Sequence, residues 1–439
     1  MSREKIALSS LKAELEIMDH SEFPTPQSCC IYRLPPQLRE VNEAAYTPMM
    51  VSIGPFHHGN KRLNSMEEVK LWFLYKFLKR IQDRSFDDYV CVLRNQEIKI
   101  RRCYSEIIPM DSDEFIRMIL TDACFIIEYF LLFLDEDRWH PKLWSMQDID
   151  RDLILLENQL PFFVLKDIFD LTFLNGYNEP GLPIEYVTYN YFYSAFMFHI
   201  VPNRRLRENL TFPYFVQHHL PRLPDGTLQV QHLCDMLRIC YVRLDQLPRE
   251  DNDNEMKPIY SACKLHDAGI KFEVNEDEVN LLKLQYSKGV LKIPRISIQD
   301  DTETLLRNVV AFEQRQFPLS RSMTDYMVLW EHFIRTEKDV EILEEKGVIK
   351  NLIGENDAVA SITKRLGRHI IHGNFNNDYI SLFKELNEFC DSPCHRYKAI
   401  FKQQYWSTPW RIASFLGGIL LLFLTLIQTI SSVIALFQN

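Results

Sequence analysis

The chain contains little glycine and none of the loops that commonly hold phosphate or activate a nucleophile. Only 13 of its 439 residues are glycine, which is about 3%, against about 7% in an average protein. The dinucleotide pattern GxGxxG, the Walker A loop, GxSxG and HExxH do not occur. The sequence therefore offers no signature of a nucleotide-binding protein or a common hydrolase, and we predict no cofactor.

Paired cysteine motifs and a basic charge balance are also absent. The ten cysteines form no CxxC pair and stand at positions 29, 30, 91, 103, 124, 234, 240, 263, 390 and 394. Several lie in apolar runs, as reduced and buried thiols do. A net charge of −10 and a pI near 5.8 disfavour electrostatic binding to nucleic acid. We therefore predict a cytosolic setting for most of the chain and no nucleic-acid partner.

Charged side chains are missing from residues 412–439. A helix over residues 412–437 would extend about 39 Å at about 1.5 Å per residue, which exceeds the roughly 30 Å hydrocarbon core of a bilayer. A buried core helix is the alternative, but core helices are usually shorter than the about 18 apolar residues that mark a span. We predict a single transmembrane anchor, whose apolar residues include Ile412, Phe415, Leu420, Phe423, Ile427 and Leu436.

The flanking charges predict the orientation of this anchor. Between residues 391 and 411 the chain carries Arg396, Lys398, Lys402 and Arg411 against the single anion Asp391. Cationic residues next to a span favour the cytosolic side, and the N-terminus lacks the apolar core of a secretory signal. We expect a tail-anchored, single-pass protein with its main part in the cytosol, at the plasma membrane.

Apolar periodicity predicts a mainly α fold, with one large helical domain over residues 28–405. A peripheral segment over residues 1–27 precedes it, and residues 406–439 form the membrane-proximal segment and anchor. A small β element is expected at residues 268–272 and 290–298, where Pro294 suggests an edge strand. The 3.6-residue pattern predicts helices near residues 65–81, 89–107, 113–134, 148–159, 161–169, 191–200, 229–247, 302–314, 323–336, 337–346, 356–366 and 379–404.

Eight segments follow one another in an order that points to a single family. They include the letters CIYRLP from residue 30, VSIGPFHHG from residue 51, DACFIIE from residue 122, DLILLENQLPFF from residue 152 and NVVAFEQ from residue 308. On these segments the chain resembles the plant family known as domain of unknown function 247. Ala123 stands where glycine is expected, and Phe56 where tyrosine is frequent. The resemblance implies a plant membrane-associated protein without established enzymatic activity, and some relatives are similar to determinants of self-recognition in grass pollination.

Five motif positions of unknown role could carry chemistry: His57, His58, Glu128, Glu157 and Glu313. The histidines could bind a metal ion, but adjacent side chains diverge and no further ligand stands at a recognised spacing. A histidine pair that fixes a turn is favoured. Glu128 and Glu157 lie in apolar runs, which can raise a carboxyl pKa and mark a general acid. Because buried charges are normally paired, hydrogen-bonded carboxylates are favoured, and we predict no catalytic or metal residue.

Two further features lie near the anchor. Cys390, Cys394 and His395 offer soft ligands, yet three are too few for a structural zinc site, and palmitoylation fits their membrane-proximal position better. Ser414 and Gly418 have the small-xxx-small spacing that lets two helices approach, so self-association is open.

The preferred functional hypothesis is a non-enzymatic, membrane-tethered protein that recognises other, unknown proteins. An uncharacterised enzyme acting on a membrane-proximal substrate and a structural tether at membrane contacts are the alternatives. Specificity is expected in the irregular stretches 172–226 and 249–256, because loops can vary without disturbing a packed scaffold. Aromatic residues anchor many protein interfaces, and those of the first stretch are Tyr186, Tyr189, Tyr191, Phe192, Tyr193, Phe212, Tyr214 and Phe215.

Overall fold

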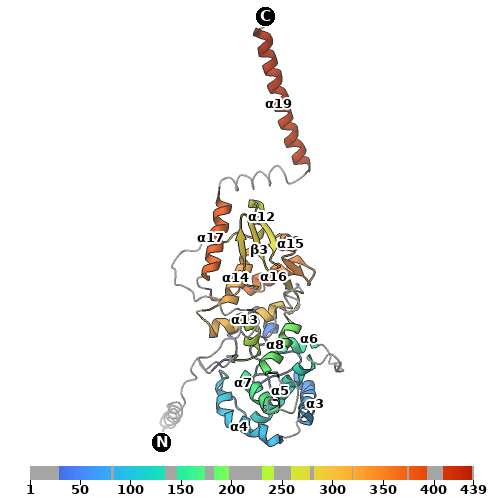
Figure 1. Cartoon of the computed structure of the whole chain (residues 1–439), viewed down its shortest axis with the longest axis vertical. Coiled ribbons are helices and arrows are strands. Elements are labelled where there is room, and N and C mark those ends of the chain that lie inside the picture. Colours follow the sequence, from blue (N-terminus) through green and yellow to red (C-terminus); the bar gives the residue numbers. More distant parts are fainter. Residues whose placement is uncertain are drawn as a thin grey trace, which may run out of the picture.

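The structure is a computed structural model that describes residues 29–80, 84–133, 146–173, 182–196, 230–241, 259–276, 281–318, 320–372, 375–392 and 409–437. Within these ranges the chain is mainly helical, with a few short strands and a long C-terminal helix (Figure 1). The predicted fold class is confirmed. The predicted domain boundaries at residues 27/28 and 405/406 fall outside these ranges and stay predictions.

The N-terminal part is a group of helices around α5. A loop with α2 (Pro36–Val41), η1 (Glu43–Tyr46) and η2 (Lys61–Leu63) leads into α3 (Asn64–Arg80), α4 (Phe86–Arg102), α5 (Ser112–Leu132), α6 (Met146–Leu153), α7 (Phe162–Phe173) and α8 (Ile184–Ala195). α5 is buried on almost every side, and α3, α4, α7 and α8 pack against it. A helix that is apolar all round must be enclosed, so α5 is the central core helix that the sequence predicts.

The C-terminal part combines helices with two small sheets. It contains α11 (Leu233–Tyr241), α12 (Ala262–Ala268), α13 (Thr302–Gln316), α14 (Ser322–Phe333), α15 (Glu337–Glu345), α16 (Asn356–Leu366) and α17 (Asn377–Asp391). The strands are β1 (Lys271–Val274), β2 (Gln285–Ser287), β3 (Val290–Ile293), β4 (Ile296–Ile298) and β5 (Ile349–Asn351). β3 pairs in parallel with β1 and antiparallel with β2, and β4 pairs in parallel with β5.

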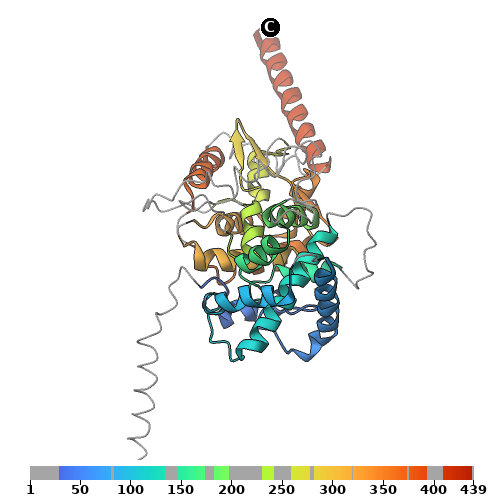
Figure 2. The same ribbon diagram turned by 60° about the horizontal axis from the view of Figure 1, so that its bottom comes forward.

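α13 joins the two parts (Figures 1 and 2). It packs against η1 near the N-terminus and against α11, α14 and α16. The Tyr32 hydroxyl donates to the carbonyl of Phe312 on α13 (3.1 Å), and the Asn308 amide donates to the carbonyl of Ala45 (2.8 Å). The buried apolar residues form one continuous cluster from Cys30 to Leu386. The helical parts therefore share one core.

Several predicted helices are right in kind and shifted in position. α3 begins at Asn64, directly after the 3-10 turn η2, and ends at Arg80, where residues 65–81 were expected. α8 occupies residues 184–195 where 191–200 was expected, and α11 begins at Leu233 where a start at residue 229 was expected. Residues 197–200 and 242–247 lie outside the described residues. α17 ends at Asp391, and the rest of the predicted helix to residue 404 lies outside the described residues.

The predicted helix over residues 148–159 is wrong in its second half, because α6 ends at Leu153. The Asn158 amide donates to the carbonyl of Asp152 (3.0 Å), and the Gln159 amide donates to those of Leu153 (2.7 Å) and Leu155 (2.8 Å). A continuing helix would give these carbonyls to backbone N–H groups four residues later. Side chains that compete for them end the helix.

The predicted strand over residues 290–298 is also wrong, because it is two strands in different sheets. β3 ends before Pro294, which has no N–H to continue a ladder. Residues 268–270 belong to the end of α12 and a turn at Gly269, so β1 starts later than predicted. Gly269 has φ +103°, a left-handed conformation that suits glycine at a helix C-terminus.

α19 (Pro409–Phe437) is a long helix that stands apart from the other described elements (Figure 1). Its stretch Ile412–Ser432 is long and apolar enough to cross a membrane, and none of it is buried within the protein. Leu420, Phe423 and Ile427 are exposed, as are most of their neighbours. The alternative of a buried core helix is therefore excluded.

Candidate functional site

The quoted motif segments meet around residues 154–161, which connect α6 and α7. This junction, defined by those residue numbers, has no helical ladder of its own. Its polar side chains bond instead to the N-terminal loop and to α11, and its backbone bonds to α13. Gln159 accepts the N–H groups of Leu233 (2.9 Å) and Cys234 (3.3 Å), and Asn308 accepts the N–H of Leu156 (2.9 Å). The junction thus holds the two parts of the fold together.

Glu157 is the charged centre of this junction. Its side chain is fully buried, yet it accepts the backbone N–H of Leu34 (2.8 Å) and Nη2 of Arg39 (2.6 Å). Nη1 of Arg33 lies 3.4 Å from the same carboxylate. The Arg33 guanidinium also stacks on Phe56, 4.6 Å from the ring centre. Both carboxylate oxygens are therefore engaged by the N-terminal loop, as expected for a buried charge with a basic partner.

Asp152 and Asn158 hold the next part of that loop. Asp152 accepts the consecutive N–H groups of Met49, Met50 and Val51 at 2.6–3.0 Å. Burial raises the pKa of Asp152 to about 6, although these donors act in the opposite direction. Asn158 accepts the N–H of Ile53 (2.8 Å). One carboxylate and one amide therefore replace the hydrogen bonds that a strand partner would give to residues 49–53.

Gly54 fits where another residue would not. Its φ is +69°, and a Cβ at this position would stand 2.5 Å from the carbonyl oxygen of Gln159. Its N–H donates to Asp122 (2.8 Å) on α5, which forms a buried ion pair with Lys70 (2.6 Å) on α3. Burial raises the pKa of the Asp122 carboxyl, while Lys70 acts in the opposite direction. The loop therefore reaches the central helix through a glycine.

The other two motif glutamates are also bound. Glu128 on α5 is fully buried and takes two hydrogen bonds from Arg80, from Nε (2.8 Å) and from Nη2 (3.1 Å). Glu313 on α13 accepts the N–H groups of Met323 (3.0 Å) and Thr324 (2.7 Å) in the first turn of α14. A carboxylate at a helix N-terminus meets unpaired N–H groups and the positive end of the helix dipole. Glu313 therefore acts as the cap of α14.

His57 lies beside the Glu157 centre, and His58 is the next residue of the same loop, where its N–H donates to the carbonyl of Pro55 (3.4 Å). Nε2 of His57 is 3.8 Å from the Glu157 carboxylate, which is beyond hydrogen-bonding distance. Burial lowers the pKa of His57 to about 4, so the ring is neutral at pH 7. Within the residues that the structure describes, no group of three His, Cys, Asp or Glu side chains is placed to hold a metal ion. Cys394 and His395 lie outside those residues.

The prediction that the aromatic residues of the stretch 172–226 anchor interfaces is wrong for three of them. Tyr189, Tyr191 and Phe192 are buried on α8, and the Tyr191 hydroxyl donates to Asp150 (2.8 Å). These rings pack on α5, for example Tyr191 against Phe130 with ring centres 4.2 Å apart. They belong to the core because α8 is a packed helix and not a loop. Tyr186 on α8 is half-buried. The side chain of Tyr193, the candidates Phe212, Tyr214 and Phe215, and the stretch 249–256 lie outside what the structure describes.

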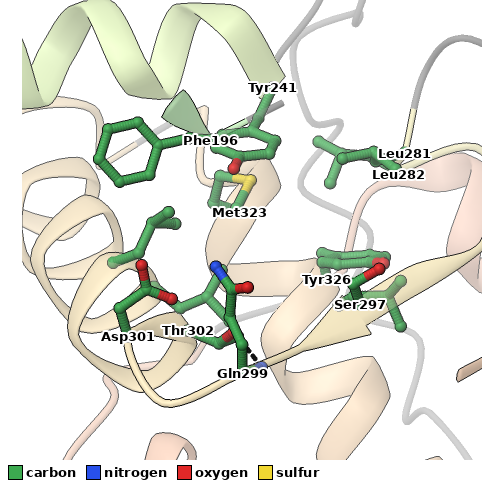
Figure 3. A pocket seen from close by; sticks show the side chains of 13 residues that line it. Phe196, Tyr241, Leu281, Leu282, Ser297, Gln299, Asp301, Thr302, Met323 and Tyr326 are labelled. Atoms are coloured by element: carbon green, nitrogen blue, oxygen red, sulfur yellow. Dashed lines mark hydrogen bonds between the residues drawn. The ribbon is translucent and has the colours of Figure 1, made fainter. Parts of the chain in front are cut away.

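A cleft opens where α11, β4, α13 and α14 meet (Figure 3). It encloses about 530 Å³ including its open side, and its walls are mostly apolar. The buried hydroxyl of Tyr241 has no hydrogen-bond partner among the described residues. Gln299 and Asp301 extend into the same space. Asp301 is the single carboxylate among the described residues that line it.

Fold and site together define a class of protein. It is a helical protein whose buried carboxylates brace an N-terminal loop, with one helix long enough to span a membrane. The chain belongs to the plant family domain of unknown function 247, described as "Plant protein of unknown function", which matches residues 31–424.

Two relatives from Arabidopsis thaliana are similar over nearly the whole chain. The "UPF0481 protein At3g47200" is 27% identical, over 94% of this chain and 87% of its own length. The "Putative UPF0481 protein At3g02645" is 24% identical, over 98% of this chain and 94% of its own length. No solved structure matches the chain.

Several polar residues hold the loop and helices in place as the glutamates do, but they were not identified from the sequence. Asp152, Asn158 and Gln159 stand in the quoted DLILLENQLPFF segment, and Lys70 and Asp122 pair across two helices. One signal was present: four polar residues interrupt an otherwise apolar run, and buried polar groups need partners. The partners of Asp152, Asn158 and Gln159 in the N-terminal loop and α11 are 74–107 residues away, and the sequence contains no sign of that.

Proposed function

We propose that this protein is a non-enzymatic recognition or signalling protein of plants, tethered to a membrane by α19 with its helical body in the cytosol. The family to which it belongs has no assigned activity. Some relatives are similar to determinants of self-recognition in grass pollination, and self/non-self recognition is therefore one specific form of this proposal. Unknown proteins are the proposed partners.

The observation that carries the proposal is the engagement of the motif carboxylates. Glu128, Glu157 and Glu313 each accept at least two hydrogen bonds from neighbouring segments. A general acid or base must reach the proton it transfers, and none of these three lines the cleft of Figure 3. Their geometry supports a scaffold in which the motif residues set the fold and other residues set the contacts.

The tether is proposed from α19 and its flanking charges. Apolar residues that are exposed along a whole helix need a nonpolar environment, and the length of Ile412–Ser432 fits a bilayer. The four cations between residues 391 and 411 favour a cytosolic body. The plasma membrane is the proposed location, and the Ser414 and Gly418 spacing supports self-association there.

Specificity is proposed to lie in residues 197–226 and 249–256. The first range excludes α8, whose aromatic residues serve the core. Segments between packed elements can change sequence at little cost to the fold. The aromatic residues Phe212, Tyr214 and Phe215 supply the side-chain types that anchor interfaces.

The enzyme and structural-tether alternatives make different demands. An enzyme that uses a carboxylate pair or a carboxylate and a histidine would need a second such group beside Asp301 in the cleft, and the described lining residues contribute one carboxylate and no histidine. A structural tether would need no specific partner in the body. Partner capture therefore separates recognition from both alternatives.

The tether is tested by placing arginine in α19. Leu421 and Leu424 are exposed on that helix, and arginine costs about 3 kcal/mol at the centre of a span relative to leucine. The double variant Leu421→Arg/Leu424→Arg should leave the membrane fraction during alkaline extraction, whereas Leu421→Ile/Leu424→Ile should stay in it. Retention of the arginine variant would contradict the tether.

Orientation is tested separately on intact cells. Protease added outside should leave the helical body uncut, because the body is proposed to face the cytosol. Asn209 begins an Asn-Leu-Thr sequon, which is glycosylated only on the lumenal or outer side. A glycan on Asn209 would show that the helical body lies on the lumenal or outer side of the membrane, which would contradict the proposed cytosolic orientation.

A further inference from the structure

Two cysteines that are far apart in the sequence lie side by side where the described chain begins. Cys30 stands at the start of the N-terminal loop, and Cys103 follows the last turn of α4. The N–H groups of Cys30 (3.0 Å) and Ile31 (2.9 Å) both donate to the carbonyl of Cys103. Ile31 and Tyr104 form a parallel β-bridge, so Cys30 and Cys103 are the next pair in register.

This register sets the separation that a disulfide needs. Paired positions of neighbouring strands lie about 4.7–4.9 Å apart, and disulfides join Cα atoms about 4.4–6.8 Å apart. The side chains point the same way, because residues paired in a parallel ladder lie on the same face of it. The Cys103 thiol itself donates to the carbonyl of Lys99 (3.4 Å). Both cysteines are present as free thiols. The backbone therefore needs no large movement to join them.

The surroundings hold Cys30 in place and favour Cys103 as the first thiol to react. Nε2 of buried His232 on α11 donates to the carbonyl of Cys30 (3.1 Å). The neighbouring Cys30 thiol lowers the pKa of the Cys103 thiol, and the charge of exposed Lys99 acts in the same direction, while burial acts in the opposite direction. A thiolate is the nucleophilic form of cysteine. Cys103 is therefore the more reactive member of the pair.

We propose that Cys30 and Cys103 form a reversible dithiol–disulfide site that hydrogen peroxide or a similar small peroxide oxidises. The Cys103 thiolate attacks one peroxide oxygen, the O–O bond breaks, and the departing hydroxide takes a proton to become water. Cys103 is then a sulfenic acid. The Cys30 sulfur attacks the Cys103 sulfur, its proton goes to the leaving hydroxyl as a second water, and the S–S bond forms.

The disulfide would join the start of the N-terminal loop to the end of α4. It would enclose α2, α3 and the N-terminal loop. Arg33, His57 and Gly54 of that loop lie against the junction at residues 154–161. A cross-link across such a long stretch restricts the unfolded chain more than the folded one. Oxidation should therefore stabilise the region that the motif carboxylates brace.

The test is a thiol map of the full chain in detergent micelles. The protein is treated with hydrogen peroxide, its remaining thiols are alkylated, and peptides are sequenced by mass spectrometry. We expect a peptide pair linked through Cys30 and Cys103, reversed by dithiothreitol, with a thermal midpoint several degrees higher in the oxidised form. Cys91, which is exposed on the same helix α4, should be alkylated and not cross-linked.

Single substitutions distinguish the pair from its neighbour Cys29. The link and the thermal shift should persist in Cys29→Ser and vanish in Cys30→Ala, with the reduced proteins unfolding at similar temperatures. A link that passes through Cys29 would overturn the assignment. Sulfenic or sulfinic acid on Cys103 without any link in the wild-type chain would overturn it as well, and that result does not depend on any variant folding.

Discussion

Each oxygen of a buried carboxylate needs a donor, and for Glu157 the donors come from the N-terminal loop. The Leu34 backbone and the guanidinium groups of Arg33 and Arg39 converge on it. Taking one partner from a buried ion pair leaves an uncompensated charge. At the scale of single residues we therefore expect substitutions here to lower stability.

Glu157→Gln should lower the free energy of unfolding by about 2–4 kcal/mol, because two guanidinium groups lose their counter-charge. Glu106→Gln is the matched control, since Glu106 also pairs with Arg33 (3.2 Å) but its side chain is 47% exposed. That control should change stability by less than about 1 kcal/mol. Denaturant titration measures both values, and equal losses would refute the role assigned to Glu157.

His232 should make stability depend on pH. Its Nδ1 accepts the N–H of Asp235 (3.1 Å) and its Nε2 donates to the Cys30 carbonyl (3.1 Å), an arrangement that only the neutral ring allows. Burial lowers its pKa to about 4 from 6.5. Its contribution to stability is therefore complete above pH 6.5 and is lost as the pH falls toward 4, by about 1.4 kcal/mol per pH unit.

The variant His232→Gln isolates this effect. Asp150 and Asp152 have pKa values raised to about 6, so they oppose the histidine by favouring the folded state as the pH falls. The difference between wild type and variant removes their contribution. Thermal unfolding is measured at several values between pH 7 and pH 4.5. The difference in stability between wild type and His232→Gln should become smaller as the pH falls. A constant difference would show that His232 has the same pKa in the folded and the unfolded protein, which would contradict the shift assigned to its burial.

At the scale of elements, amphipathic pattern predicted most helices, and α16 coincides with its predicted range. The pattern failed where side chains decide the backbone. Asn158 and Gln159 end α6 by taking its carbonyls, although residues 148–159 have a helical apolar repeat. Arg80 could not be assigned to Glu128, nor Arg39 to Glu157, because these pairs depend on packing between distant segments. Burial of the glutamates was predictable, and the identity of their partners was not.

Leu156 tests the placement of the junction at residues 154–161. It is fully buried, so Leu156→Asp should cost several kcal/mol, a large share of the roughly 5–15 kcal/mol stability of a domain. Ile107→Asp is the control, because Ile107 is 96% exposed and a surface change is usually worth about 0.5 kcal/mol or less. Circular dichroism during heating compares the two. Normal stability of Leu156→Asp would mean that the junction is exposed.

At the scale of the whole molecule, a continuous core from Cys30 to Leu386 is followed by an exposed apolar helix. The core makes the helical body a stable scaffold, and the helix supplies a proposed route to a membrane. In this account the motif residues fix the scaffold, and residues outside the core select the partners. The two roles can be separated by experiment, since they assign different consequences to different substitutions.

The most direct measurement is the set of proteins labelled by a proximity enzyme fused to the full chain in its native membrane. Exchanging residues 197–226 for those of a relative should change this set while the membrane fraction and the unfolding temperature stay the same. His58→Ala should leave the set unchanged. The account would be contradicted if the same proteins were labelled after the exchange of residues 197–226 but were no longer labelled in His58→Ala or in folded Glu157→Gln. That result would favour a ligand or catalytic site at the motif residues.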